Sequence, residues 1–150
     1  MGNSKTKQLT PGSLKKAERE LLAFSGLQEN QYEVKKVYTN DDETVYMTTI
    51  LVGNPDNPPL LLAHGYGGSG ALFYKVMKGL SENFYVILID LVGMGSSARP
   101  EWTASNGAEA DEYFMNALEK WRINMELTNF FIAAHSYGGY LLGSYAALYP

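Results

Sequence analysis

The chain has 150 residues, a formal net charge of −4, and 45% hydrophobic and 13% aromatic residues. This length suits one globular domain with a sizeable core, and the composition excludes a disordered chain. The negative charge argues against a nucleic-acid partner, and the absence of cysteine excludes disulfides and a cysteine nucleophile. No group of His, Asp and Glu residues has metal-ligand spacing, so we predict no metal and no cofactor.

Residues 1–10 are predicted to be a flexible leader that carries a lipidation signal. The run Met1 to Thr6 matches M-G-x-x-x-[ST], in which Gly2 accepts myristate. One myristoyl chain binds membranes weakly, so a second attraction is needed. Basic residues near the signal could supply it against anionic lipid: Lys5, Lys7, Lys15, Lys16 and Arg19. The first 30 residues lack the apolar core of a secretory signal, so the expected location is cytoplasmic and peripheral to a membrane. The alternative to myristoylation is a polar leader without modification.

Residues 11–150 are predicted to form a partial domain that begins with a helix and a hairpin. Thr10-Pro11 is typical of a helix start. The apolar side chains that follow have helical spacing and predict one buried face: Leu14, Ala17, Leu21 and Phe24. Two runs rich in β-branched and aromatic residues, 32–38 and 44–52, flank a turn and predict an antiparallel hairpin.

From residue 60 onward, predicted strands and helices alternate. The expected elements are a strand at 60–63, a helix at 71–80, a strand at 84–90, a helix at 109–125, a strand at 129–133 and a helix at 140–148. The strands are continuous apolar runs, which is typical of strands buried on both faces. The pattern predicts an α/β fold in which an antiparallel hairpin precedes parallel strands joined by crossover helices.

The last strand and helix are joined by a small-x-Ser-x-Gly sequence centred on Ser136. A serine on a sharp turn between a strand and a helix is the context of a nucleophile elbow. The residues two before and two after the serine must be small, and Ala134 and Gly138 meet that need. The alternative is an ordinary helix N-cap. His135 is not favoured as a base, because adjacent residues in such a turn point in different directions.

Small residues also recur along the helix that follows the serine. Gly139, Gly143 and Ala147 are four residues apart and lie on one face of a helix. We expect this stripe to let the helix pack closely on the sheet.

A second glycine-rich turn, at 65–70, supports two different interpretations. It reads G-x-G-x-x-G after a strand, and Asp90 ends the next strand 20 residues after Gly70, which is the dinucleotide-binding layout of an oxidoreductase. Two features count against this interpretation. A helix and a hairpin precede the turn, and His64 and Ser136 are left unexplained.

The alternative treats residues 64–67 as the turn that supplies half of an oxyanion hole. The backbone N–H groups of Tyr66 and Tyr137 would then face the oxygen that becomes negative during acyl transfer. Gly65 and Gly67 would let the backbone approach the substrate closely, and His64 would be a structural donor. In this interpretation, which we favour, Asp90 and the Gly/Ser-rich loop after it are structural.

Several of these segments occur together in one family. They are the leading helix at 13–18, His64-Gly65-Tyr66-Gly67-Gly68, the D-L-V-G-M-G-S-S-A-R-P run at 90–100, Glu119-Lys120-Trp121-Arg122 and His135-Ser136-Tyr137-Gly138-Gly139. From about Ser13 to Pro150 the chain resembles the phospholipid-directed α/β-hydrolases. This subgroup includes N-acyl-phosphatidylethanolamine lipases, cardiolipin deacylases, and a lysophosphatidic acid acyltransferase that is also a lipase co-activator.

The resemblance implies a serine hydrolase or acyltransferase that acts on phospholipid or lysophospholipid acyl groups at a membrane surface. Ser136 would be the nucleophile, and the catalytic acid and histidine, which follow the serine in this fold, are expected beyond Pro150. The elbow strand would then be an unpaired sheet edge.

The co-activator relative lacks the elbow serine, which motivates a second hypothesis. In it the chain is a non-catalytic regulator of lipid metabolism with a lipase or lipid-droplet partner. The cardiolipin-directed relative adds the mitochondrion as an alternative location.

Overall fold

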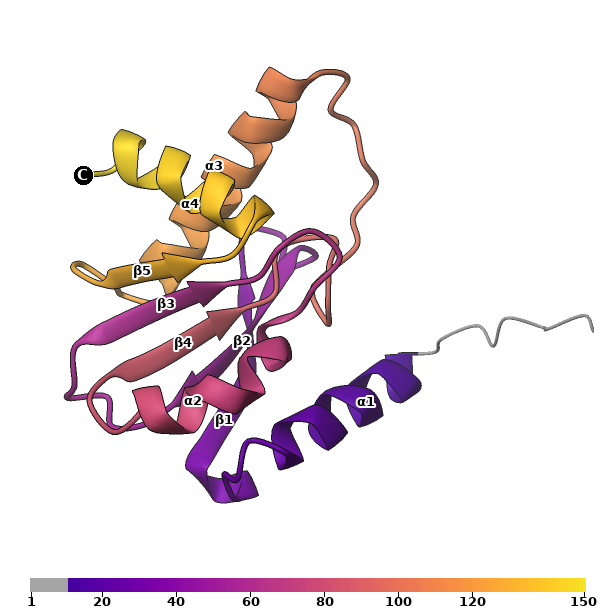
Figure 1. The fold of residues 1–150 in the computed structure, drawn as a ribbon. Helices are drawn as coiled ribbons and strands as arrows, with labels where there is room; N and C mark the ends of the chain where they lie inside the picture. Colours follow the sequence, from indigo (N-terminus) through magenta and orange to yellow (C-terminus); the bar gives the residue numbers. More distant parts are fainter. Residues whose placement is uncertain (1–10) are drawn as a thin grey trace, which may run out of the picture.

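The computed structural model describes residues 11–150 (Figure 1). Gly2 and the rest of the predicted leader lie outside the described residues. The helices are α1 (Pro11–Ala23), α2 (Tyr74–Leu80), α3 (Gly107–Asn124) and α4 (Tyr137–Leu148). The strands are β1 (Tyr32–Tyr38), β2 (Tyr46–Val52), β3 (Pro59–Ala63), β4 (Tyr85–Ile89) and β5 (Phe131–Ala134). Two 3₁₀ turns, η1 (Glu29–Gln31) and η2 (Gly70–Phe73), precede β1 and α2.

The five strands form one sheet in the order β1-β2-β4-β3-β5. β1 and β2 are an antiparallel hairpin, and β2 also runs antiparallel to β4. β3 pairs in parallel with β4 on one side and with β5 on the other. The predicted fold class, an antiparallel hairpin followed by parallel strands, is therefore confirmed.

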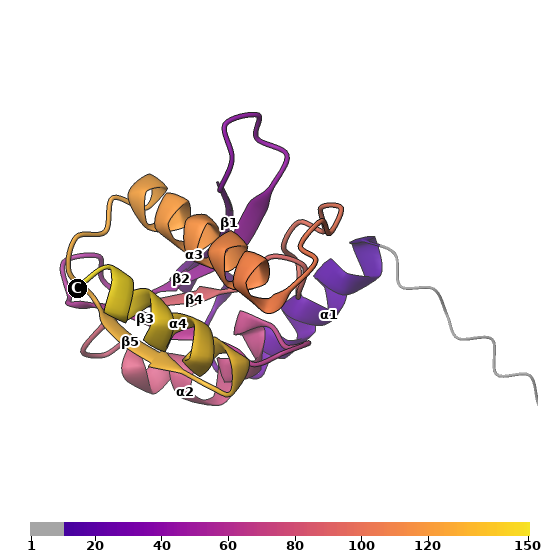
Figure 2. The ribbon, with the colours of Figure 1, turned by 90° about the horizontal axis from the view of Figure 1, so that it is seen from above.

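Helices cover both faces of this sheet. α1 and α2 pack against one face, where Leu22 and Met77 are buried with Leu88 of β4. α3 and α4 cover the opposite face, where Trp121 and Leu141 are part of the larger buried cluster (Figures 1 and 2). Because both faces are covered, successive side chains of β4 are buried in opposite directions, as its continuous apolar sequence indicates.

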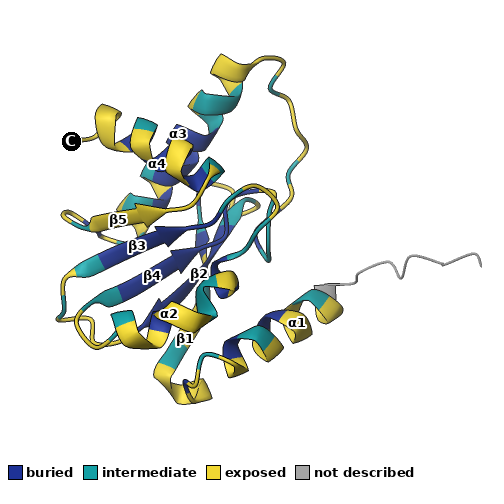
Figure 3. Ribbon diagram, in the orientation of Figure 1, coloured by how far each residue is buried: buried dark blue, intermediate teal, exposed yellow. Residues whose placement is uncertain are grey.

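The edge of the sheet at β5 is open. All four residues of β5 are exposed, and among the described residues the strand pairs with β3 alone. Figure 3 shows this contrast between exposed β5 and the buried interior of β3 and β4. The predicted unpaired edge is present in the described part of the chain.

The buried face of α1 agrees only in part with the predicted one: Leu14 and Leu21 are half-buried, and Leu21 packs against the buried cluster. Glu18 and Leu22 are buried, whereas Ala17 is exposed and Phe24 lies beyond the helix with 77% of its surface exposed. Positions 18 and 22 are buried where positions 17 and 21 were predicted, because Glu18 accepts a hydrogen bond from the Ser96 hydroxyl, 2.7 Å away. Apolar spacing alone could not reveal a polar anchor 78 residues away in the sequence.

The predicted small-residue stripe of α4 also lies on the wrong face. Gly139, Gly143 and Ala147 are exposed, and the helix instead buries Gly138, Leu141, Leu142 and Tyr145. The leucines and the tyrosine remove more apolar area from water than the small residues would, so they determine which face packs inward.

Candidate active site

Ser136 lies on the sharp turn between β5 and α4. Its backbone has φ 53° and ψ −119°, a left-handed conformation that an L-residue adopts at a cost of about 1–3 kcal/mol. The turn is fixed to the end of β3 by the His135 N–H, which donates to the Ala63 carbonyl oxygen at 3.0 Å. The serine side chain is left exposed at the carboxyl end of the sheet.

Close packing holds the Ser136 turn against the turn that follows β3. A Cβ atom at Gly138 would collide with the His64 and Ala63 carbonyl oxygens, and one at Gly65 would lie 3.0 Å from the Ser136 Cβ. The closest contacts that require Gly138 are therefore with the end of β3, and the predicted crowding against Ala134 stays a prediction. The two glycines bring the two predicted halves of the site into contact.

Two backbone N–H groups at this junction have no acceptor in the described part of the chain. Within residues 11–150 neither the Tyr66 N–H nor the Tyr137 N–H donates a hydrogen bond. The neighbouring Gly67 N–H, by contrast, donates to the Met94 sulfur at 3.4 Å. The two tyrosine rings meet edge to face with centroids 6.3 Å apart, so the two residues lie side by side. The arrangement offers two free donors beside an exposed hydroxyl.

His64 is a structural residue in this geometry. Its Nε2 accepts the Leu91 N–H at 3.1 Å, so its Nδ1 carries the proton and donates to the Gly65 carbonyl oxygen at 2.6 Å. The ring is buried, and burial lowers the pKa of His64 below its ordinary value. The imidazole is therefore neutral at pH 7, and both nitrogens are already engaged.

The Ser136 hydroxyl has no base in the described part of the chain. No hydrogen bond joins it to an imidazole or a carboxylate within residues 11–150, and none joins it to His135 beside it. The expectation that the catalytic acid and histidine lie elsewhere stays a prediction.

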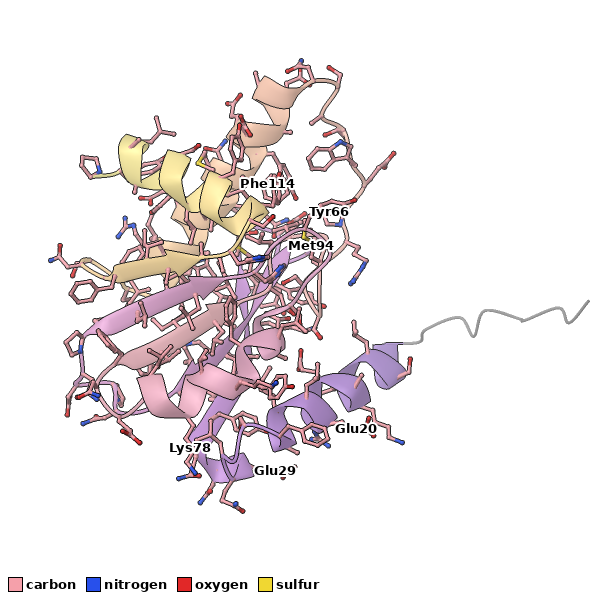
Figure 4. The ribbon with its side chains drawn as sticks, in the orientation of Figure 1. Glu20, Glu29, Tyr66, Lys78, Met94 and Phe114 are labelled. Carbon is pink, nitrogen blue, oxygen red and sulfur yellow. The ribbon has the colours of Figure 1, made fainter. Side chains whose placement is uncertain are left out.

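Aromatic side chains line one side of the elbow. Phe114 of α3 meets the Tyr137 ring at 5.8 Å and the Trp102 ring at 6.0 Å. Figure 4 shows Phe114, Tyr66 and Met94 gathered near the carboxyl ends of the central strands. No local sequence pattern marks Trp102 and Phe114 as site residues, because only the fold brings them beside the elbow.

Asp90 follows β4 at the same edge of the sheet but is 1% exposed. Its two carboxylate oxygens accept the N–H groups of Gly70 and Ser96, each at 2.6 Å. Burial raises the pKa of Asp90, and these two hydrogen bonds oppose that rise. A dinucleotide site would need this carboxylate free for a ribose and the Gly70 N–H free for a phosphate, so the dinucleotide-binding interpretation does not fit.

Residues 11–150 contain neither a candidate metal site nor a candidate membrane-spanning helix. In that range no group of three or more His, Asp and Glu side chains is arranged to hold a metal ion. No helix there is both long and apolar enough to cross a membrane.

This chain belongs to the alpha/beta hydrolase fold family, whose sequence profile matches residues 58–150. It is 34% identical over 119 residues to a probable 1-acylglycerol-3-phosphate O-acyltransferase of Oryza sativa, a match that covers 79% of this chain and 29% of the rice protein. It is 30% identical over 122 residues to the human (lyso)-N-acylphosphatidylethanolamine lipase, covering 81% of this chain and 35% of the lipase. The chain thus spans about a third of the length of these curated relatives.

A solved structure shows the same fold. The carboxylesterase CesB of Bacillus subtilis superposes with a TM-score of 0.74 at 21% identity, covering 90% of this chain and 44% of the esterase. The family match and the acyltransferase and lipase relatives confirm the resemblance to phospholipid-directed α/β-hydrolases noted from the sequence.

Proposed function

We propose that the chain forms the nucleophile-bearing part of a serine hydrolase or acyltransferase that acts on the acyl groups of phospholipids or lysophospholipids. The observation that carries the proposal is Ser136, strained and exposed beside the free N–H groups of Tyr66 and Tyr137. The relatives named for a lysolipid acyltransferase and a lipase support the substrate class.

The chemistry follows from this geometry. The Ser136 Oγ attacks the acyl carbonyl carbon, and the carbonyl oxygen becomes negative as the tetrahedral intermediate forms. The Tyr66 and Tyr137 N–H groups stabilise that oxygen, each by about 2.7–4 kcal/mol. The serine proton passes to a base outside residues 11–150. Collapse of the intermediate breaks the original acyl–oxygen bond, and the headgroup-bearing alcohol leaves with the proton from that base. The acyl group remains on Ser136 until water or a lysolipid accepts it.

The aromatic side chains beside the elbow, Tyr66, Trp102, Phe114 and Tyr137, suit the apolar part of such a substrate. Tyr66 and Trp102 are 84% and 53% exposed, and both lie in the chain of ring contacts that reaches the elbow. Exposed aromatic rings next to a nucleophile provide apolar area against which an acyl chain can pack.

Membrane association is part of the same proposal. Myristate on Gly2 and the basic residues after it would hold the chain at a cytoplasmic membrane surface, where its substrate resides. Mitochondrial membranes are the alternative location.

The direct test is turnover of a lysophospholipid by the native protein, with any segment that follows Pro150 present. Ser136→Ala should lower turnover at least about a thousandfold, because the covalent step is lost. Ser144→Ala, on the same helix but away from the elbow, is the matched control and should retain activity. Unchanged turnover by the Ser136→Ala protein would refute the nucleophile assignment.

A regulator without catalysis is the second candidate. It is favoured by the absence of any base bonded to Ser136 within residues 11–150, and its partner would be a lipase or a lipid-droplet protein. Measurable esterase turnover from the 150-residue chain alone would contradict this candidate, since regulation requires no acyl transfer.

A further inference from the structure

A groove separate from the Ser136 site lies on the α1 side of the sheet. It runs between α1 and the β1–β2 hairpin and is closed at one end by residues 96–99. Its volume is about 990 Å³, at the upper end of the range in which small ligands and headgroups bind. The elbow residues do not line it.

The groove is basic although the chain as a whole is acidic. Four basic side chains lie on its side of the sheet: Lys15, Arg19, Lys36 and Arg99. Lys35 also borders the groove, but side chains alternate along β1, and its partner Thr49 contacts Trp121 on the opposite face. The acidic residues of the lining are Glu18 and Glu29, and the latter is labelled near the carboxyl end of α1 in Figure 4. An excess of positive charge in a protein of net charge −4 marks a surface suited to an anion.

Contacts within the lining keep the groove open and its cations in place. The Arg99 guanidinium is held by the Gly95 carbonyl oxygen at 2.7 Å, and the Lys36 ammonium lies 4.0 Å above the Tyr46 ring. The Glu18 carboxylate is tied to the Ser96 hydroxyl at the base of the groove, which fixes α1 against the loop. Lys15 and Arg19 make no salt bridge among residues 11–150, in contrast to Lys16, which pairs with Glu20.

The surroundings of the groove favour a lipid over a soluble anion. Val34 lines the groove yet is 41% exposed, so an apolar side chain stands beside the cations. In Figures 1 and 2 the amino end of α1 and the loop after β4 lie on the same side of the molecule as the carboxyl ends of β3 and β4. That side also carries the exposed ring of Tyr66, a residue type enriched at membrane interfaces.

We propose that this groove binds the phosphate of an anionic membrane phospholipid, with Lys15, Arg19 and Lys36 contacting it from the two walls. A protein docked in this way would turn the carboxyl edge of its sheet, and therefore Ser136, toward the bilayer. The proposal goes beyond the catalytic assignment and does not depend on it.

The test is co-sedimentation of the full 150-residue chain with vesicles. All proteins carry Gly2→Ala, so that myristate contributes nothing. Vesicles of phosphatidylcholine with phosphatidic acid should bind the chain, and vesicles of phosphatidylcholine alone should bind it far less. Since one basic residue near an anionic surface contributes about fivefold to binding, Lys15→Gln with Arg19→Gln should weaken binding about thirtyfold. Both side chains are exposed, so the variant should fold.

Two controls separate the groove from general surface charge and from α1 alone. Lys75→Gln with Lys120→Gln removes the same charge from exposed positions outside the groove. This control should have much less effect, and an equal loss would overturn the proposal. Lys36→Gln changes the opposite wall and should weaken binding about fivefold. If Lys36→Gln had no effect, α1 would bind vesicles as an isolated helix, and the proposal would be overturned. Displacement of the protein from vesicles by inorganic phosphate, at an equal phosphate concentration, would assign the groove to a soluble anion and would also overturn the proposal. Ser136→Ala should bind vesicles normally, so this test and the catalytic one can fail independently.

Discussion

Two turns at the carboxyl edge of the sheet each carry a polar residue within two positions of a strand end, but the surroundings of the two residues are opposite. Asp90 after β4 is buried, and both carboxylate oxygens have hydrogen-bond partners. Ser136 after β5 is exposed, and the Tyr66 and Tyr137 N–H groups beside it are without acceptors in residues 11–150. The turn at Asp90 uses its polar groups within the fold, whereas the strained turn at Ser136 leaves its donors unpaired, as the proposed oxyanion hole requires.

His64 connects the two regions. Its ring accepts the Leu91 N–H next to Asp90, and its carbonyl oxygen is the nearest atom to the Cβ position of Gly138 beside Ser136. The Asp90 turn is therefore linked to the Ser136 turn through a residue whose two ring nitrogens are both hydrogen-bonded.

The largest effect on stability is expected from the turn at Asp90. Asp90→Ala leaves the N–H groups of Gly70 and Ser96 without their acceptors and should lower the free energy of unfolding by about 2–4 kcal/mol. Chemical denaturation measures this change. Asp111→Ala, which removes an exposed carboxylate bonded to Tyr140, should cost under about 1 kcal/mol. Equal losses of unfolding free energy from the two variants would mean that the hydrogen bonds of Asp90 contribute no more to stability than those of a surface carboxylate.

A smaller loss is expected from the packing of the elbow on β3. Gly138→Ala drives a methyl group into the carbonyl oxygens of His64 and Ala63 and should cost about 1–3 kcal/mol of unfolding free energy. Gly143→Ala on the same helix has no atom within 4 Å of the new Cβ and should instead stabilise the protein by about 0.5–1 kcal/mol. Thermal unfolding of both variants gives the comparison, and stabilisation by Gly138→Ala would contradict the close contact.

The smallest effect is a pH dependence at the residue that joins the turns. Burial lowers the pKa of His64 in the folded protein below its value of 6.5 in the unfolded chain. Below pH 6.5 the unfolded chain therefore binds a proton at His64 that the folded chain does not bind. Stability from this group is complete above pH 6.5 and is lost as pH falls toward the folded pKa, by less than about 1.4 kcal/mol per pH unit.

Denaturation across that pH window should show a shallower slope for His64→Gln, whose amide oxygen can still accept the Leu91 N–H. His135→Gln serves as the control for the loss of an imidazole. An unchanged slope in His64→Gln would mean that His64 titrates normally in the folded protein.

The elements that depend on local pattern were predictable from the sequence. Continuous apolar runs located β3 and β4, and the small-x-Ser-x-Gly sequence between a strand and a helix located the turn at Ser136. Glycine requirements were harder to assign, since Gly138 is fixed by the end of β3, a contact between segments more than 70 residues apart.

Features that depend on partners distant in sequence could not be predicted. The burial of Glu18 depends on Ser96, and the exposed stripe of α4 depends on which face offers more apolar area. Trp121 shows the same limit: its indole N–H donates to Thr49 at 2.9 Å, a contact that only the folded chain reveals. Helical spacing defines candidate faces, and tertiary contacts select among them.

Mapping of a fluorophosphonate adduct by mass spectrometry tests the central claim most directly. The native protein, with any segment that follows Pro150 present, is treated with the probe and digested. A single adduct on the peptide that contains Ser136, absent from Ser136→Ala and retained in Ser144→Ala, is the predicted result. An adduct on another serine, or labelling that persists in the Ser136→Ala protein, would contradict the assignment of the exposed turn as the reactive one.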